Sequence, residues 1–351
     1  MWPDVSVLLP VLDEAATIDA CLASLTAQDY PGRLEVVVAD GGSRDGTGER
    51  LAAWSRSNPA VRVVDNPARL QSDGVNVAAR RAGGEILVRA DAHTTYAPDY
   101  VRRSVEALRS TDAVAVGGLL RPEGTTPFGR AVAAAMRSPL AVGPGRFHHA
   151  RLRQTVDTVY LGAFRAADFH RLGGPRSLPS GVAEDADLYY RWRRAGETVL
   201  LDPAIRSTYR PRESPAALWR QHVRYGRGKA EMLWLNRRLP SWRPLGPAGL
   251  VAGLLAGGLA AASGRPRPLR LLVGAWSAVV VAAAAGSARS PAAALRVAAA
   301  TAIMHLGYGL GLLRGLLAGP GAVAAVARST VDRHPSDAGE PGPAGDGAGL
   351  A

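Results

Sequence analysis

The sequence predicts an α/β domain with a mostly parallel sheet and helices on both faces, followed by membrane-associated helices. Two regions of different composition predict this division. Within residues 1–240, short runs of Val, Ile and Leu alternate with segments of helical periodicity, which is typical of a parallel sheet covered on both faces. Residues 247–319 are dominated by Ala, Leu, Gly and Val, as expected of helices in contact with lipid.

Strands and helices alternate through the N-terminal part of the chain. Apolar, β-rich runs predict strands over residues 5–9, 35–39, 61–64, 86–89 and 114–118. Helical patterns lie between the strands, over residues 15–28, 46–57, 73–82 and 99–109, and another helix is predicted over 216–238. We therefore expect an α/β domain over residues 1–240, a helical region over 241–320 and a disordered tail over 321–351, whose composition cannot offset the entropy of ordering.

Three apolar segments follow the domain, over residues 247–263, 269–288 and 292–318. A transmembrane helix needs about 20 residues. The first segment is short and rich in Gly, so we expect it to lie in the membrane interface or to re-enter, while the other two span. This arrangement keeps the arginines of residues 265–270 on the cytoplasmic side with the N-terminal domain. A soluble helical bundle is disfavoured because the segments lack charged outer faces.

The third apolar segment contains ionisable side chains. His305 and Tyr308 share a helix face, and ionisable residues inside a bilayer usually face protein or take part in function. The neighbouring Gly307, Gly309 and Gly311 favour close packing against another helix. The alternative is a contact with a lipid-linked ligand.

The formal net charge is +12, almost entirely from arginine, and Lys229 is the only lysine. Positive charge is densest just before the apolar segments, at Arg206, Arg210, Arg212, Arg220, Arg224, Arg227, Lys229, Arg237, Arg238 and Arg243. That placement fits an anionic membrane surface. No nucleic-acid partner is expected, because zinc-ligand spacing, aromatic RNA motifs and a basic recognition helix are absent from the sequence. The single cysteine, Cys21, fits a reducing compartment, and we expect no signal peptide.

Polar side chains follow three of the predicted strands, at the point where each strand ends. They are Asp13 and Glu14 in the turn that Pro10 begins after the first strand, Asp40 after the second, and Asp91 and His93 after the fourth. Ligands of parallel sheets bind at the carboxyl ends of the strands. The first strand is not followed by a GxGxxG pattern, which argues against a dinucleotide-dependent oxidoreductase.

These motifs resemble glycosyltransferase family 2, whose members have the GT-A fold. Residues 5–14 are similar to its first strand and Pro-x-x-Asn-Glu turn, with Asp13 in place of Asn, and residues 36–47 to its second strand and base-recognising turn. Asn76 and residues 84–91 are similar to the stretch that leads to its DxD metal motif. Residues 184–191 resemble its Glu-Asp motif, and residues 221–225 its Gln-x-x-Arg-Trp motif, with Tyr225 in place of Trp. The five motifs occur in order over residues 4–240.

A finer likeness points to one subgroup of the family. Residues 91–93, 156–159, 225–228 and 305–311 look like the succinoglycan-type exopolysaccharide glycosyltransferases.

The resemblance implies a nucleotide-sugar donor and a divalent cation, Mg²⁺ or Mn²⁺. Asp91 and His93 occupy the DxD position and are close enough in sequence to reach one metal, since Mn²⁺ accepts imidazole as well as carboxylate. Because His93 replaces the second Asp, it either ligates the metal or contacts the diphosphate. Arg69 either pairs with the diphosphate, whose geometry a guanidinium matches, or is a solvated loop arginine.

Further donor contacts are implied by the resemblance. It assigns Asp40 to the base and Asp13 or Glu14 to the ribose region, because strand-end carboxylates can accept hydrogen bonds from these groups. Pro10 and Asn76 belong to the same donor-binding stretches.

Sugar transfer to a hydroxyl requires a base, and a positioned carboxylate contributes about 10²–10⁴-fold. Asp185 is the candidate, by likeness to the Glu-Asp motif, with Glu184 on the acceptor side beside it. Acids also favour a helix N-terminus, but that preference does not by itself explain Glu184, Asp185 and Asp187 together. One base without an evident enzyme nucleophile implies direct displacement with inversion.

The helix predicted over 216–238 carries the last motif. Gln221 and Arg224 are expected to hold the acceptor or the leaving diphosphate, and Tyr225 to stack on a sugar. An amphipathic interfacial helix is the alternative. The segment 137–153 is either a loop over the active site or a connector, and its histidines at 148 and 149 lack a partner at metal-ligand spacing.

The sequence thus predicts a metal-dependent, inverting glycosyltransferase on the cytoplasmic face of the cell membrane. A UDP-sugar is favoured over a GDP-sugar as donor, and the expected acceptor is a polyprenyl-linked saccharide in exopolysaccharide or cell-surface glycan assembly. One alternative is a polyprenyl-phosphate sugar synthase, for which Asp185 would be less critical. The other is a catalytically dead membrane scaffold. A processive polymer synthase is disfavoured because the few spans offer no evident translocation channel.

Overall fold

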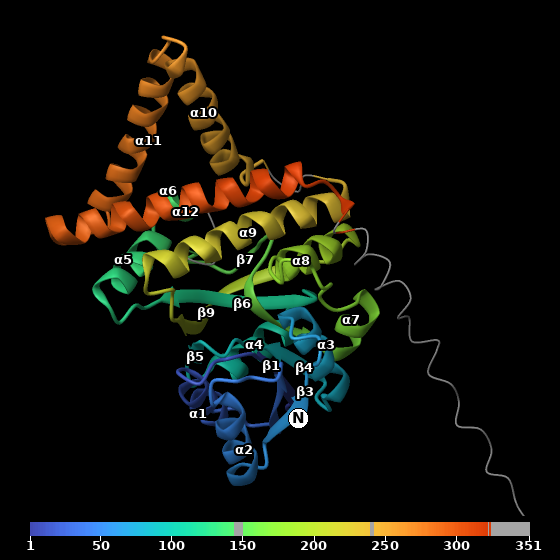
Figure 1. Cartoon of the computed structure of the whole chain (residues 1–351). Helices are drawn as coiled ribbons and strands as arrows, with labels where there is room; N and C mark the ends of the chain where they lie inside the picture. The colour runs from blue at the N-terminus through green and yellow to red at the C-terminus, as the bar shows by residue number, and fades with distance from the viewer. Residues whose placement is uncertain (144–149, 239–241, 322, 324–351) are drawn as a thin grey trace, which may run out of the picture.

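A computed structural model describes residues 1–143, 150–238, 242–321 and 323 of the chain. An α/β domain forms one part of the molecule, and a layer of long helices lies over one side of it (Figure 1). Nearly all of the predicted tail over 321–351 falls outside the described residues, as do the histidines at 148 and 149.

One mixed sheet forms the centre of the domain. Its strands are β1 Val5–Val11, β2 Leu34–Asp40, β3 Val61–Asp65, β4 Ile86–Arg89, β5 Thr94–Tyr96, β6 Ala115–Pro122, β7 Gln154–Thr155, β8 Tyr160–Arg165 and β9 Val199–Tyr209. Their spatial order is β3-β2-β1-β4-β8-β6-β9-β5, with β7 beside β9. The strands from β3 to β4 pair in parallel, whereas β8 runs antiparallel to both β4 and β6. The carboxyl ends of β1, β2, β3 and β4 therefore share one edge.

Helices cover both faces of this sheet, as predicted. The helices before the apolar region are α1 Ile18–Thr26, α2 Thr47–Ser57, α3 Gln71–Arg81, α4 Tyr100–Arg109, α5 Pro127–Met136, α6 Pro139–Val142, α7 Ala166–Leu172, α8 Glu184–Arg194 and α9 Pro215–Asn236. Because successive strand side chains point to opposite faces, Val7 and Leu9 of β1 pack with α1 and α4, while Leu8 packs with α3 and α8. The two apolar layers hold the strand ends rigidly in place.

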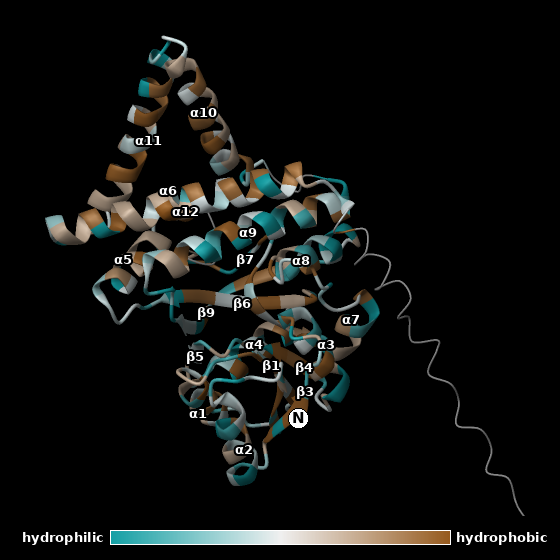
Figure 2. Cartoon of the chain, in the orientation of Figure 1, coloured by the Kyte–Doolittle hydropathy of each residue, from teal (hydrophilic) through white to brown (hydrophobic). Residues whose placement is uncertain are grey.

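The helical region contains α10 Leu245–Ala262, α11 Arg267–Ala285 and α12 Pro291–Leu317, each long and apolar enough to cross a membrane. Helices α10 and α11 project from the domain as a largely hydrophobic hairpin, while α12 lies along α9 (Figures 1 and 2). Of the three apolar segments, the last therefore lies against the domain, and the arginines of residues 265–270 lie at the far end of the hairpin. The number of membrane spans stays a prediction.

Glycines explain why α12 pairs with α9. A Cβ atom on Gly226 of α9 would lie 2.1 Å from the backbone oxygen of Tyr308, and one on Gly311 would lie 2.0 Å from that of Val223. Only glycine permits such a close approach of two helix backbones. The expectation that the glycines near His305 serve close helix packing is confirmed.

Candidate functional site

A cavity of about 700 Å³ lies between the carboxyl edge of the sheet and the helical layer. Polar side chains line the end toward β4 and α8, at Gln71, Arg89, Asp91, Tyr160, Glu184 and Asp185. Apolar side chains line the end toward the long helices, at Met136, Leu140, Val142, Leu218, Pro247 and Met304. Residues separated by more than 200 positions in the sequence therefore line one cavity, which has a polar end and an apolar end.

Asp91 follows β4 directly and is almost completely buried. Its Oδ1 accepts a hydrogen bond from Gln71 Nε2 at 2.6 Å, and its Oδ2 accepts one from Tyr160 at 3.2 Å. Its backbone N–H donates to the Tyr96 hydroxyl at 2.7 Å. These bonds hold the carboxylate at the polar end of the cavity.

His93 lies in the turn after Asp91, with its Nδ1 3.3 Å from Glu14 Oε1. Burial alone would lower the pKa of His93, but the hydrogen bond to Glu14 and the charges of Asp91 and Glu14 outweigh burial and raise it. Burial would likewise raise the pKa of Glu14, yet its bonds to His93 and Thr17 lower it. The two side chains therefore interact directly beside the cavity.

A metal site made of protein groups alone is absent from the described residues: they contain no cluster of three or more His, Cys, Asp and Glu side chains suited to an ion. Asp91 and His93 supply two ligands of the types that Mn²⁺ accepts. An ion held by these two side chains would take its other ligands from phosphate oxygens or water, as is usual for Mg²⁺ at phosphate-binding sites.

The loops after β1 and β2 are joined by hydrogen bonds. The backbone N–H of Asp13 donates to Ser43 Oγ at 2.9 Å, and Asp13 Oδ1 accepts from the N–H of Arg44 at 2.7 Å. Ser43 Oγ in turn donates to Asp40 Oδ1 at 2.6 Å. Asp13 has a φ of 56°, in the left-handed region that non-glycine residues rarely adopt. This pairing holds the two predicted donor-binding acids close together.

Arg69 extends the same edge from the loop after β3. It too has a left-handed backbone, with a φ of 58°, and its guanidinium donates to the carbonyl of Gly42 at 2.8 Å. Arg69 is exposed and bound to the loop after β2. Its place at the strand ends suits a diphosphate contact, although it does not line the cavity itself.

Two of the predicted donor residues support the frame of the site. Pro10 lies buried in β1, where a Cβ atom on Gly74 of α3 would approach it to 2.8 Å. Asn76 donates to the carbonyl of Pro175 at 2.8 Å and so links α3 to the segment before α8. Neither residue is part of the cavity wall.

The N-terminus of α8 places two neighbouring acids in different environments. Glu184 is 5% exposed and bonds to Arg89 of β4 at 2.7 Å, so its carboxylate is engaged inside the protein. Burial disfavours charge on Arg89, but the carboxylates of Glu184, Asp91 and Asp185 outweigh burial and raise the pKa of its guanidinium. Asp185 is only partly buried and lines the cavity, where its Oδ1 accepts from the N–H of Ala186 at 2.7 Å. Of the two acids, Asp185 is the one positioned to meet a ligand.

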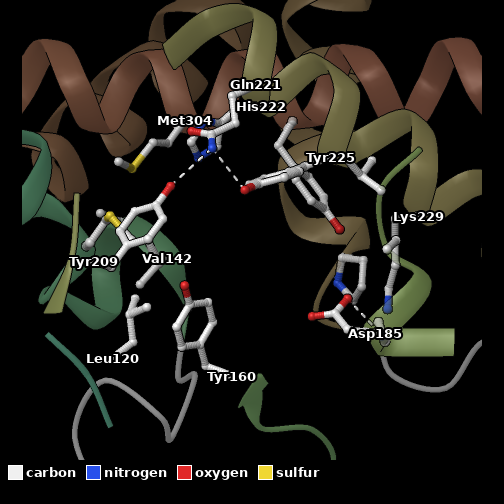
Figure 3. A pocket seen from close by; sticks show the side chains of 18 of the residues that line it. Leu120, Val142, Tyr160, Asp185, Tyr209, Gln221, His222, Tyr225, Lys229 and Met304 are labelled. Carbon is white, nitrogen blue, oxygen red and sulfur yellow. Dashed lines mark hydrogen bonds between the residues drawn. The ribbon is translucent and has the colours of Figure 1, made fainter. Parts of the chain in front are cut away.

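Helix α9 presents one row of side chains to the cavity, at Gln221, Tyr225 and Lys229 (Figure 3). These residues are four apart and therefore share a helix face. Gln221 Nε2 donates to the hydroxyls of Tyr209 at 3.3 Å and Tyr225 at 3.0 Å, as the dashed lines in Figure 3 mark. Arg224 is exposed and lies outside the cavity wall. The predicted motif therefore reaches the site through Gln221 and Tyr225.

Helix α6, within the segment 137–153, also lines the cavity through Leu140, Ala141 and Val142. The carbonyl of Leu140 is 3.0 Å from His305 Nε2 of α12, and Trp276 of α11 donates to His305 Nδ1 at 3.2 Å. A histidine that receives one bond and donates the other is neutral. His305 therefore ties three helices together, which favours a structural role.

Sequence reasoning missed Gln71, Arg89, Tyr160, Tyr209 and Lys229 in the cavity wall. Two of them carry a signal in the sequence. Arg89 is a charged residue at the end of an otherwise apolar strand, two positions before Asp91. Lys229 is the only lysine and continues the four-residue spacing of Gln221 and Tyr225.

Comparisons with known proteins agree with this architecture. The family model described as Glycosyl transferase family 2 matches residues 6–169. The succinoglycan biosynthesis protein ExoA of Rhizobium meliloti (strain 1021) is 33% identical over 316 residues, which cover 89% of this chain and 94% of that protein. An N-acetylglucosaminyltransferase of Mesorhizobium japonicum is 28% identical over 64% of this chain and 56% of its own length.

Among solved structures, the mannosyltransferase PcManGT from Pyrobaculum calidifontis, in complex with GDP-Man and Mn²⁺, is similar with a TM-score of 0.53 at 24% identity. The likeness covers 95% of this chain and 89% of that one, and it confirms the predicted GT-A fold. The match to the family model and the extent of the similarity to ExoA show that the chain belongs to glycosyltransferase family 2.

Proposed function

We propose that the protein transfers a sugar from a nucleotide-sugar donor to a hydroxyl of a lipid-linked saccharide in exopolysaccharide or cell-surface glycan assembly. The observation that carries this proposal is the two-sided cavity, in which Asp91 and Asp185 share a chamber with apolar side chains of α6, α10 and α12. Carboxylates serve the transfer, and apolar walls suit a lipid carrier. Similarity to a succinoglycan biosynthesis protein supports the class of acceptor.

The roles of the residues follow from where they lie. Asp185, at the cavity wall, accepts the proton of the attacking hydroxyl, which is a contribution of about 10²–10⁴-fold in rate. Direct attack without an enzyme nucleophile inverts the anomeric centre. The loops that carry Asp13, Asp40 and Arg69 hold the nucleotide, and Gln221 holds Tyr225 beside the acceptor.

Asp91 and His93 would hold a divalent cation together with the donor diphosphate. Such an ion neutralises the negative charge that develops on the departing phosphate. The Mn²⁺ in the mannosyltransferase complex supports this assignment, and its GDP-Man makes a GDP-sugar a donor to test beside the UDP-sugars that we favour.

The proposed location is the cell membrane, with the catalytic domain on its cytoplasmic face. Three apolar helices support membrane association. The single cysteine is buried and unpaired, in keeping with a reducing compartment, and the arginines of α9 suit an anionic membrane surface.

The test is transfer by membranes that contain the full chain, supplied with labelled UDP- and GDP-sugars, native lipid extract, and Mn²⁺, Mg²⁺ or chelator. We expect one donor to be consumed with metal and not with chelator, and the product to have the inverted anomeric configuration. Asp185→Asn should lose about 10²–10⁴-fold in rate. Asp112→Asn, an exposed substitution outside the site, is the matched control.

Two outcomes would contradict parts of the proposal. Full activity of Asp185→Asn would point to an acceptor without a proton to remove, such as a lipid phosphate. A folded protein that binds no nucleotide and turns over no donor under any metal would point to a scaffold.

A further inference from the structure

Lys229 is a half-buried cation for which the proposed reaction has no assigned role. It extends from α9 into the cavity toward Asp185 (Figure 3). Its ammonium contacts Met232 Sδ at 3.3 Å, and a thioether is a weak acceptor. Within the described part of the chain, no carboxylate lies within ion-pair distance of it. A strongly hydrated group is thus partly shielded from water without a matching anion.

Two of the three carboxylates whose charge reaches Lys229 are already paired with arginines. Asp187 is bound by Arg176 and Arg191, and Asp157 is paired with Arg193 at 2.8 Å. Burial lowers the pKa of Lys229, and the charges of Asp185, Asp187 and Asp157 oppose this effect without cancelling it. A further negative charge bound next to Lys229 would therefore stabilise its ammonium group.

The position of Lys229 in the cavity indicates which anion would supply that charge. Lys229 is one helical turn beyond Tyr225 and extends toward the general-base candidate Asp185. The loops that would hold the nucleotide follow β1, β2 and β3 and lie outside the cavity wall. Pro244, Pro247 and Tyr308 of the long helices line the same chamber. Consider a lipid-linked saccharide whose lipid lies on these helices and whose hydroxyl lies at Asp185. Its linking phosphate would then lie between the helices and Asp185, where Lys229 is.

We propose that Lys229 binds the phosphate that joins the acceptor saccharide to its lipid carrier. This inference rests on the proposed function and extends it to a further binding residue. An ammonium group binds phosphate as a point charge. The leaving diphosphate of the donor is the other possible source of phosphate in the cavity, and the two sources make different predictions.

The experiment measures binding to the full chain in detergent or nanodiscs, without turnover. The probes are geranylgeranyl diphosphate, the uncharged alcohol geranylgeraniol, and UDP and GDP with Mn²⁺. We compare the wild type with Lys229→Met, Lys229→Arg and the control Arg220→Met, which removes an exposed cation of the same helix outside the cavity wall. Thermal unfolding of each variant checks its folding.

We expect Lys229→Met to weaken binding of geranylgeranyl diphosphate about tenfold or more and to leave binding of geranylgeraniol and the nucleotides unchanged. Lys229→Arg should retain most of the diphosphate affinity, and Arg220→Met all of it. If Lys229→Met instead weakens nucleotide binding, the residue serves the donor and the inference is wrong. Unchanged binding of every probe also overturns it, and in that case a wild type that still transfers sugar leaves the proposed function standing.

Discussion

The two sides of the cavity are prepared for a ligand in different ways. On the sheet side, the charged groups of the loops that follow the strands, just outside the cavity wall, already have partners: Asp40 accepts from a serine hydroxyl, Arg69 donates to a backbone carbonyl and Glu14 pairs with a histidine. On the helical side, among the described residues, Asp185 accepts from an N–H of its own helix and Lys229 contacts a sulfur. The charged groups on the sheet side are therefore preorganised by the protein. Those on the helical side can still accept or donate hydrogen bonds to a ligand.

This difference indicates where specificity is set. Preorganised groups bind a donor with little rearrangement. Groups without protein partners form new hydrogen bonds and ion pairs only when a matching acceptor binds. Substitutions on the sheet side should therefore change donor binding, and those on the helical side should change acceptor binding with little effect on nucleotide affinity.

Arg89→Met tests a buried ion pair that joins the two sides. Arg89 lies on β4, and its partner Glu184 begins α8. Removal of the guanidinium leaves a buried carboxylate without a counter-charge, and we expect a loss of about 3–5 kcal/mol in the free energy of unfolding. Denaturant unfolding followed by tryptophan fluorescence measures this loss.

The control for Arg89→Met is Arg62→Met, which breaks a largely exposed contact with Glu35 and should cost about 0–1 kcal/mol. The double variant Arg89→Met with Glu184→Leu should recover part of the loss, since no buried charge is left. If the single variant is as stable as the control, the two sides do not depend on this pair.

Gly311→Ala perturbs the helical side alone. Its new Cβ would lie 2.0 Å from the backbone oxygen of Val223, so α12 must move away from α9. We expect a loss of about 1–3 kcal/mol in stability, as is usual for overpacking, together with a raised KM for the acceptor and unchanged nucleotide affinity. Gly258→Ala is the control, because no atom lies within 4 Å of its new Cβ. If Gly311→Ala lowered the nucleotide affinity as much as the acceptor affinity, the two sides would not be independent.

Low pH should lower the folding stability that Asp187 of α8 contributes. Burial raises the pKa of Asp187, but its bonds and charge pairing with Arg176 and Arg191 and its bond from Asn236 outweigh burial and lower it. A carboxyl with a lowered folded-state pKa stabilises fully above its unfolded pKa of about 3.9 and loses this effect as the pH falls through the folded value. We expect stability to fall below about pH 4. In urea unfolding at several pH values, Asp187→Asn should flatten this decline, whereas Asp112→Asn should not.

The parallel half of the sheet could be predicted because its strands are continuous apolar runs, and residues 86–89 were placed without error as β4. Strands β5, β7, β8 and β9 were not predicted; β5 and β7 are only three and two residues long. Gly162 interrupts the apolar run of β8, while β9 contains Asp202, Pro203 and Arg206 and is buried in alternation toward its end. Such strands depend on their neighbours in the sheet more than on their own composition.

Individual site residues were predicted where a strand or helix end determines their position. Asp91 and Asp185 lie in the cavity for this reason. The sequence pattern could not decide which of two adjacent acids faces inward, and the structure places Glu184 against Arg89. Nor could it give the rotation of α9, which brings Lys229 rather than Arg224 into the chamber. Both distinctions arise from tertiary packing.

The histidine that links α6, α11 and α12 makes the chamber sensitive to its surroundings. His305 connects a wall of the cavity at Leu140 to Trp276, on a helix that we place in the bilayer. A change in bilayer thickness that tilts the hairpin would be transmitted to that wall through two hydrogen bonds. The width of the acceptor chamber would then follow the lipid around it, so that lipid composition tunes the selectivity of the enzyme.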